Sequence, residues 1–327
     1  MRPTPPPADL VARFRRDLEA LIGSPSQRIG LAVSGGPDSL ALLLLAEAAL
    51  PGAVEAATVD HRLRPESAIE ALQVADLCAR LGVPHALLPV TVPDGPAGLQ
   101  GEARKSRYAA LAGWAQGSGI AFLATGHHQD DQAETLLMRL RRGSGVGGLA
   151  GIRPVRRDEG VTVVRPLLGW SKAELVHLVA STGIEPADDP SNRDDRFDRT
   201  AMRRLLSGDG GFEPQRLART ASALAEADEA LDWAADALAE DRCTSAGGEW
   251  RIDPAGLPRE LRRRLLSRAI GEVRAEHGLG PAWTGSEDVE GLLAALETGG
   301  AGTLGGVAAR GGSVWHLRLA PPRRSPS

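Results

Sequence analysis

One run of residues combines the parts of a phosphate-binding loop: Ser34-Gly35-Gly36-Pro37-Asp38-Ser39. The run follows a short apolar segment and leads directly into a second one, which is typical of a turn from a strand into a helix. Two glycines let the backbone approach an anion, and the N–H groups of the turn and of the helix start point toward it. The two serines add hydroxyl donors. No Gly-Lys-Ser/Thr follows, so the loop differs from a Walker A loop, and it also lacks the GxGxxG spacing.

Asp38 is the unexpected member of this loop. A carboxylate beside a polyphosphate makes sense mainly if it orients the loop or holds Mg²⁺ between phosphate oxygens. The alternative is a Gly-Gly turn in which Asp38 or Ser39 caps the helix. The segment alone leaves both interpretations open.

A second group of polar side chains follows another apolar run, within the segment Thr125 to Thr135. If a helix begins inside this segment, His127, Asp131 and Glu134 fall on one helix face, at the same rim as the phosphate loop. Two aspartates near a phosphate loop are reasonable outer ligands for Mg²⁺. The alternative is that Asp130 and Asp131 only complement a helix N-terminus, which would not explain two adjacent histidines.

The segment Val59 to Arg64 ends a further apolar run. Backbone groups at Val59 and His61 are candidates to hold an adenine edge, whereas the alternative is an ordinary solvated loop.

Short apolar runs alternate with segments of helical period from Ile29 to about Leu167, which predicts an α/β fold with a doubly wound, mostly parallel sheet. The expected strands are Ile29–Val33, Val54–Val59, His85–Val90, Ala121–Thr125 and Val161–Val164. The expected helices between them are Leu40–Leu50, Glu66–Leu81, Glu102–Gln116 and Asp131–Arg141. Ligands of such sheets bind beyond the carboxyl ends of the strands, which is where the three polar loops lie.

After Pro190 the pattern becomes helical, so we expect a catalytic domain over residues 1–210 and a smaller, mainly helical domain over 211–327 with a disordered tail. Its helices are expected at Pro214–Leu238, Pro258–His277 and Ser286–Thr298, and a small hairpin is expected around Gly311-Gly312.

Composition excludes several classes of protein. The longest apolar run has seven residues, far below the roughly 20 of a membrane span, and the N-terminus lacks the apolar core of a secretory signal. We therefore expect a cytoplasmic protein. The only cysteines, Cys78 and Cys243, match no zinc or iron-sulfur spacing. With 3% aromatic residues and a net charge of -4, neither base stacking nor a strongly basic coat can be the main binding device.

Four segments together resemble the PP-loop ATP pyrophosphatase superfamily: SGGPDS, VDHRLR, EARKSRY and GHHQDDQAET. Three more make the chain similar to the short form of the tRNA(Ile)-lysidine synthetase family: RRGSGVGGLAGI, RPLL with SKAEL, and DDPSNRDDRFDRTAMR. The resemblance is dense from about Leu31 to Arg204 and weak beyond.

This resemblance implies an ATP- and Mg²⁺-dependent ligase. ATP would adenylate the C2 oxygen of the cytidine at the first anticodon position of tRNA(Ile) with anticodon CAU, and the ε-amine of free L-lysine would displace AMP to form lysidine. It also implies a homodimer.

The resemblance further assigns roles to residues of this chain. It places Asp38 and Asp131 near Mg²⁺ and phosphate, His127 close to the α-phosphate, and Arg104 or Arg107 as a phosphate or substrate clamp.

The same resemblance places a substrate- or RNA-binding region at Asp188, Asp189, Arg199 and Arg203, although turn composition and an exposed helix face would also explain these residues. The family usually has Arg-Asn-x-Ile-Arg where this chain has Arg199-Thr200-Ala201-Met202-Arg203.

Farther along the chain, arginines of one predicted helix are candidates for phosphate contacts or for an ordinary exposed face. They are Arg259, Arg262, Arg263, Arg264 and Arg268.

Three other functions compete with the ligase. They are an RNA thiolase of the PP-loop type, an amidotransferase-type synthetase acting on a small metabolite, and a nucleotide-binding module without turnover. A thiolase usually needs catalytic or cluster-binding cysteines, and Cys78 falls in the middle of a predicted helix, where a buried structural thiol is expected.

Overall fold

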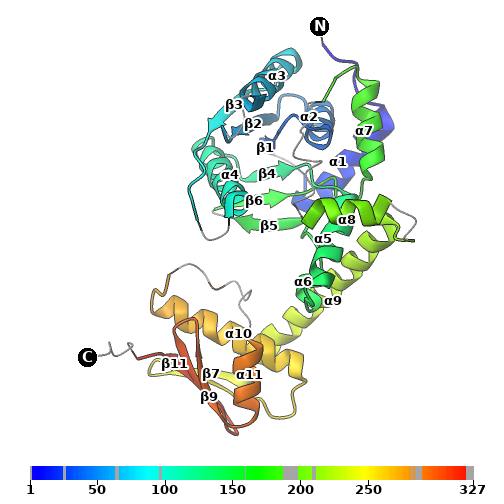
Figure 1. The fold of residues 1–327 in the computed structure, drawn as a ribbon. Coiled ribbons are helices and arrows are strands. Elements are labelled where there is room, and N and C mark those ends of the chain that lie inside the picture. Colours follow the sequence, from blue (N-terminus) through cyan, green and yellow to red (C-terminus); the bar gives the residue numbers. More distant parts are fainter. Residues whose placement is uncertain are drawn as a thin grey trace. The chain divides into compact units, whose positions relative to one another are not determined.

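The computed structural model describes residues 2–24, 27–62, 66–95, 98–158, 160–186, 198–207, 211–280, 283 and 289–321 (Figure 1). The chain divides into two compact units, Met1–Ala225 and Glu226–Ser327. The domain boundary at residue 210 that the sequence indicates stays a prediction.

The N-terminal unit is built on a six-stranded sheet with the order β3-β2-β1-β4-β6-β5. Its strands are β1 (Ile29–Ala32), β2 (Val54–Asp60), β3 (His85–Pro89), β4 (Phe122–Thr125), β5 (Val155–Asp158) and β6 (Val161–Val164). All pairs are parallel except that of β5 with β6. The doubly wound, mostly parallel sheet expected from the sequence is confirmed. The edge strand β5 was not expected, because it reads Val-Arg-Arg-Asp and has no apolar alternation.

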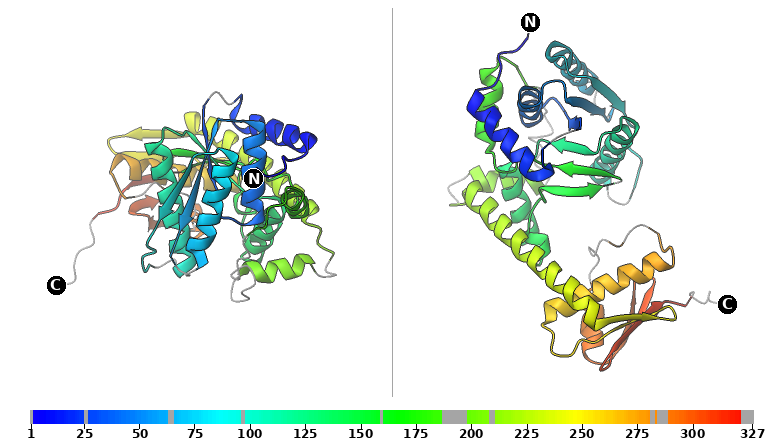
Figure 2. Two further views of the ribbon diagram at one scale, coloured as in Figure 1. Left: turned by 90° about the horizontal axis from the view of Figure 1, so that it is seen from above. Right: turned by 180° about the vertical axis from the view of Figure 1, so that it is seen from behind.

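Helices cover both faces of this sheet, as the alternation of side chains along the strands requires. On one face, Ala56 and Ala124 join the core formed with α1 (Ala8–Ile22), α2 (Pro37–Ala49), α3 (Glu66–Leu81) and α7 (Lys172–Ser181). On the other face, their neighbours Ala57 and Leu123 pack with α4 (Gly98–Gly117). Figure 2 shows α1 and α7 beside α2, with α4 on the opposite side of the strands.

The other helices that begin in this unit are α5 (Gln129–Arg141), α6 (Val146–Leu149), α8 (Asp198–Ser207) and α9 (Pro214–Arg242). Within the described residues, no helix combines the length and the apolar character that crossing a membrane requires.

The C-terminal unit contains a five-stranded antiparallel sheet with the order β7-β8-β11-β10-β9. The strands are β7 (Cys243–Ala246), β8 (Glu249–Ile252), β9 (Ala301–Leu304), β10 (Val307–Arg310) and β11 (Trp315–Leu319). Helices α10 (Arg259–Glu276) and α11 (Glu290–Glu297) pack against the sheet through a core that includes Ile270, Leu293 and Trp315.

The expected hairpin is present as β10 and β11, but the sheet is larger than the sequence indicated. The strands β7 and β8 are four residues each, and β7 has no buried residue, so the sequence offers little alternation to identify them. Gly247 and Gly248, both at positive φ, form the turn between them.

Candidate active site

The phosphate loop lies between β1 and α2 and is closed by its own serines. Gly36 is the N-cap of α2, Pro37 opens the helix, and Gly35 takes a φ of +91°, which favours glycine. The Ser34 amide donates to Ser39 Oγ at 3.1 Å, and Ser39 Oγ donates to the Gly36 carbonyl at 2.9 Å. No side chain caps the helix at its N-cap, so the interpretation of Asp38 or Ser39 as a cap is not supported.

The loop after β4 passes directly against this turn. A Cβ atom on Gly126 would lie 2.9 Å from the Asp38 carbonyl oxygen and 3.1 Å from the Ser39 amide nitrogen. Because β4 and β2 flank β1 on opposite sides, the contact falls where the strand order reverses, which is where α/β sheets bind ligands.

His127 lies in the β4–α5 loop, since α5 begins at Gln129 with His128 as its N-cap. The expected helix face shared by His127, Asp131 and Glu134 is therefore wrong. His127 Nδ1 lies 2.8 Å from Thr125 Oγ1. Burial lowers the pKa of His127 to about 3, with further lowering from nearby arginines against the opposing effect of Asp131. The ring is thus neutral at pH 7 and can bond a phosphate oxygen through an N–H.

His128, which the sequence analysis did not select, lies among three carboxylates. Its Nε2 is 3.4 Å from Asp38 Oδ2 and 3.6 Å from Asp131 Oδ2, and its Nδ1 is 3.6 Å from Asp130 Oδ2. Its Nδ1 accepts a hydrogen bond from the Asp130 amide at 3.2 Å, so the ring proton lies on Nε2, which faces Asp38 and Asp131. The sequence alone does not distinguish these two adjacent histidines. They differ because α5 begins at Gln129, which makes His128 the N-cap and leaves His127 in the preceding loop.

Guanidinium groups gather around the Tyr108 ring on α4. Arg104 and Arg107 lie 5.1 and 5.7 Å from its centroid, and Arg156 lies 5.5 Å from it. Arg165, directly after β6, is 3% exposed and donates to the Arg153 carbonyl at 2.6 Å. The predicted pair Arg104 and Arg107 thus belongs to a larger cationic group, and Arg165, the first residue of the segment RPLL, is a member to which the sequence analysis gave no role.

The end of β2 supplies the third polar loop. Asp60 Oδ1 accepts from the Arg62 amide at 2.9 Å and from Ser67 Oγ at 2.7 Å, which holds the turn with Arg62 at a φ of +53°. His61 Nδ1 is buried and has no hydrogen-bond partner among the described residues. Burial, then the charge of Arg107, lowers the pKa of His61. The adenine-holding role of Val59 and His61 stays a prediction, and this buried ring nitrogen is compatible with it.

Arg203 on α8 reaches α5, where its Nε donates to Glu134 Oε1 at 2.7 Å. Burial opposes the charge, but the hydrogen bond and charge of Glu134, and the charges of Asp131 and Asp38, raise the pKa of Arg203. Arg203 therefore lies in the field of the same carboxylates as His128. Asp188 and Asp189 lie outside the described residues, as does the side chain of Arg199, so their binding roles stay predictions.

Asp38 and Asp131 fit a role beside Mg²⁺. Both direct Oδ2 toward His128, and Asp38 Oδ1 is buried without a hydrogen-bond partner among the described residues. The described part of the chain contains no group of three or more His, Cys, Asp or Glu side chains that could hold a metal ion by itself. A magnesium ion here would complete its shell with phosphate oxygens and water, as it usually does.

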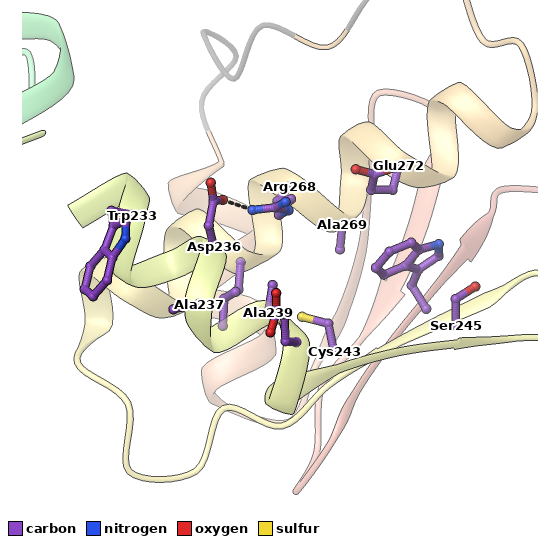
Figure 3. A pocket seen from close by; sticks show the side chains of 12 residues that line it. Trp233, Asp236, Ala237, Ala239, Cys243, Ser245, Arg268, Ala269 and Glu272 are labelled. Carbon is purple, nitrogen blue, oxygen red and sulfur yellow. Dashed lines mark ion pairs between the residues drawn. The ribbon is translucent and has the colours of Figure 1, made fainter. Parts of the chain in front are cut away.

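The C-terminal unit has a pocket of about 640 Å³ that contains none of these residues. Figure 3 shows Arg268 paired with Asp236 between α10 and α9, with Cys243 and Ser245 farther along the wall. Its charged side chains are three carboxylates and one arginine, which is not the composition of a phosphate site.

All five α10 arginines that were candidates for phosphate contacts are paired with carboxylates. The pairs are Arg259 with Glu290 and Glu297, Arg262 with Glu297, Arg263 with Glu260, Arg264 with Asp228, and Arg268 with Asp236. This pairing favours the structural interpretation of that helix.

Comparisons with known proteins agree with the site. A family model of the PP-loop domain matches residues 10–208. The tRNA(Ile)-lysidine synthase of Novosphingobium aromaticivorans is 46% identical over 96% of this chain and 95% of its own. That of Zymomonas mobilis is 40% identical over 95% of this chain and 94% of its own.

Among solved structures, a U34-tRNA thiolase from Methanococcus maripaludis superposes with a TM-score of 0.53. It is 17% identical, over 66% of this chain and 79% of that one, and therefore supports the fold alone. The sequence relatives show more than the fold, because they are at least 40% identical to this chain over nearly its whole length. The chain belongs to the tRNA(Ile)-lysidine synthase family of PP-loop proteins.

Proposed function

We propose that this protein joins L-lysine to C2 of the cytidine at the first anticodon position of tRNA(Ile) with anticodon CAU, using ATP. The observation that carries the proposal is the meeting of the phosphate loop with the β4–α5 loop at Gly126, which brings Asp38 and Asp131 to one histidine. Family membership supplies the substrates.

In the first half-reaction, the cytidine C2 oxygen attacks the α-phosphorus of ATP and pyrophosphate leaves. The backbone N–H groups of Ser34 to Ser39 and the start of α2 are suited to hold the departing phosphates. Arg104 and Arg107 supply positive charge on the α4 side, and neutral His127 offers an N–H to an α-phosphate oxygen. Asp38 and Asp131 would hold Mg²⁺, which would neutralise charge on the phosphates.

In the second half-reaction, the ε-amine of lysine attacks C2, AMP leaves, and the nitrogen loses a proton. The carboxylate that receives the lysine ammonium is proposed among Asp130, Asp188 and Asp189, with Arg199 and Arg203 contacting the RNA. Glu134 already pairs with Arg203 at this edge of the site.

The two cysteines offer little support for a thiolase. Burial raises the pKa of Cys78 to about 12 and that of Cys243 to about 11, so neither forms a reactive thiolate at neutral pH. Cys78 lies in the core packed around α2 and α3.

The proposal includes a homodimer that acts in the cytoplasm. Family membership supports both parts, and sedimentation of the free protein would measure the oligomeric state directly.

The proposal is tested by measuring the rate at which pyrophosphate is released from ATP, with Mg²⁺ present and lysine absent. We expect release with a tRNA(Ile) transcript of anticodon CAU, and at most background release when its first anticodon base is changed to U. Equal release with both transcripts, or none with either, would overturn the proposal.

A further inference from the structure

His128 connects three helix starts. Its ring faces Asp38 in the first turn of α2, it caps α5 by accepting from the Asp130 amide at 3.2 Å, and its backbone N–H donates to Asp131 Oδ2 at 3.1 Å. Asp130 in turn accepts from the Lys172 amide at 2.9 Å, where α7 begins. The His128 side chain is 4% exposed.

The two ring nitrogens serve different partners. Nδ1 belongs to α5, because it accepts from the Asp130 amide. Nε2 faces outward from that helix, toward Asp38 Oδ2 and Asp131 Oδ2. A residue needed only to cap α5 would use the Nδ1 side alone, since an N-cap needs one acceptor close to the backbone.

Asp38 and Asp131 approach the same nitrogen from two different helices. Two carboxylates this close repel each other unless a proton or cation lies between them. Arg203 is a cation in the same field and its Nε donates to Glu134 Oε1, whereas Nε2 of His128 lies within 3.6 Å of both carboxylates. The ring of His128 is therefore the group placed to hold both carboxylates before a ligand binds.

We propose that His128 is a positioning residue whose Nε2–H holds Asp38 and Asp131 through their Oδ2 atoms, so that Asp38 Oδ1 stays directed to ATP and Mg²⁺. This inference rests on the proposed function only in naming ATP and Mg²⁺ as the ligand. Among the residues that the structure describes, Asp38 Oδ1 is buried and has no hydrogen-bond partner, as this arrangement requires.

Two substitutions separate positioning from capping. His128→Asn keeps an acceptor at the place of Nδ1 and is a good N-cap, but its side chain is too short to reach Asp38. His128→Gln places an amide N–H near the position of Nε2, and is a poorer cap. His177→Asn, at an exposed histidine on α7, is the matched control.

The experiment measures binding of ATP to the intact protein with and without Mg²⁺, together with the melting temperature of each variant. We expect His128→Asn to melt within a few degrees of wild type but to bind ATP with Mg²⁺ at least tenfold more weakly. His128→Gln should stay within about threefold of wild type, and His177→Asn should match it.

The reverse pattern, with affinity retained by His128→Asn and lost in His128→Gln, would show a helix cap and overturn the proposal. Affinity retained in both variants would also overturn it. If either variant unfolds, Asp38→Asn is added to it and the melting temperature is measured again. If His128 holds the two carboxylates together, removing one of them should restore folding. If the wild-type protein does not transfer lysine, the proposed function is wrong, but the ATP-binding results for the His128 variants still test the positioning role.

Discussion

Asp38 presents one oxygen to His128 and leaves the other, Oδ1, buried without a partner among the described residues. We therefore expect Asp38 Oδ1 to find its partner when ATP and Mg²⁺ bind. We expect Asp38→Asn to lower the rate of pyrophosphate release by about 10²-fold to 10³-fold, as the loss of one charge-stabilising group does. Asp94→Asn, at an exposed aspartate in the β3–α4 loop, is the control. Turnover within threefold of wild type for Asp38→Asn would remove this residue from the reaction.

His127 should make the stability of the folded protein depend on pH in the acid range. Its pKa lies near 3 in the folded protein against an ordinary value of 6.5, so between these pH values only the unfolded chain binds the proton. Stability from this group is therefore complete above pH 6.5 and falls as the pH drops through that window. At pH 5 the loss is about 2 kcal/mol, from about 1.4 kcal/mol per pH unit.

The test compares melting temperatures at pH 7 and pH 5 for wild type and His127→Gln. We expect the decrease to be smaller in the variant, which cannot take up the proton. A decrease as large in the variant would place the acid sensitivity in other groups.

At this scale the sequence identified the phosphate loop and the aspartates correctly as neighbours, because the carboxyl ends of adjacent parallel strands meet at one edge. It did not separate His127 from His128. That distinction depends on the start of α5, because the helix begins at Gln129 and so makes His128 its N-cap and leaves His127 in the loop, and helix ends are the least certain part of a sequence-based assignment. Arg165 was quoted in the segment RPLL but received no role, because its burial beside Tyr108 arises only when β6 and α4 pack together.

Among the elements, the contact between the β4–α5 loop and the start of α2 is the one that assembles the site. Gly126→Ala would place a methyl group 2.9 Å from the backbone oxygen of Asp38, which a backbone cannot avoid without moving. We expect a loss of about 1 to 3 kcal/mol in the free energy of unfolding and at least tenfold weaker ATP binding.

Gly113→Ala is the matched control, since the added Cβ on α4 meets nothing within 4 Å. It should leave ATP binding unchanged and raise stability by about 0.5 to 1 kcal/mol, the usual gain inside a helix. ATP binding by Gly126→Ala equal to that of the control would contradict the importance of this contact.

Elements with a strong apolar period were predicted well, and short polar ones were not. Helix α3 and strand β6 match the expected residues at both ends, since flanking glycines and apolar runs define them. Strands β5, β7 and β8 carry few buried side chains, so their pairing depends on partners distant in sequence.

On the scale of the whole molecule, the C-terminal unit is held by charges as well as by its apolar core. Arg264 Nη2 lies 2.6 Å from Asp228 Oδ1, with side chains 11% and 7% exposed. Removing the arginine would take away the cation that lies 2.6 Å from this buried carboxylate. We expect Arg264→Ala to lower the free energy of unfolding of this unit by about 3 to 5 kcal/mol.

Arg268→Ala provides the comparison, since its pair with Asp236 is 43% and 64% exposed and should contribute less than about 1 kcal/mol. Urea unfolding followed by tryptophan fluorescence would measure both, and Trp315 and Trp250 lie in this unit. If both substitutions lower the free energy of unfolding equally, the Arg264–Asp228 pair does not stabilise the unit as its burial predicts.

The account as a whole is tested most directly by transfer of labelled lysine to RNA. Wild-type protein, ATP and Mg²⁺ would be incubated with transcripts of tRNA(Ile) and tRNA(Met), both with anticodon CAU. We predict ATP-dependent incorporation into the isoleucine tRNA at the first anticodon position and none into the methionine tRNA. Pyrophosphate release without lysine incorporation into either RNA would contradict the ligase while leaving the ATP site in place.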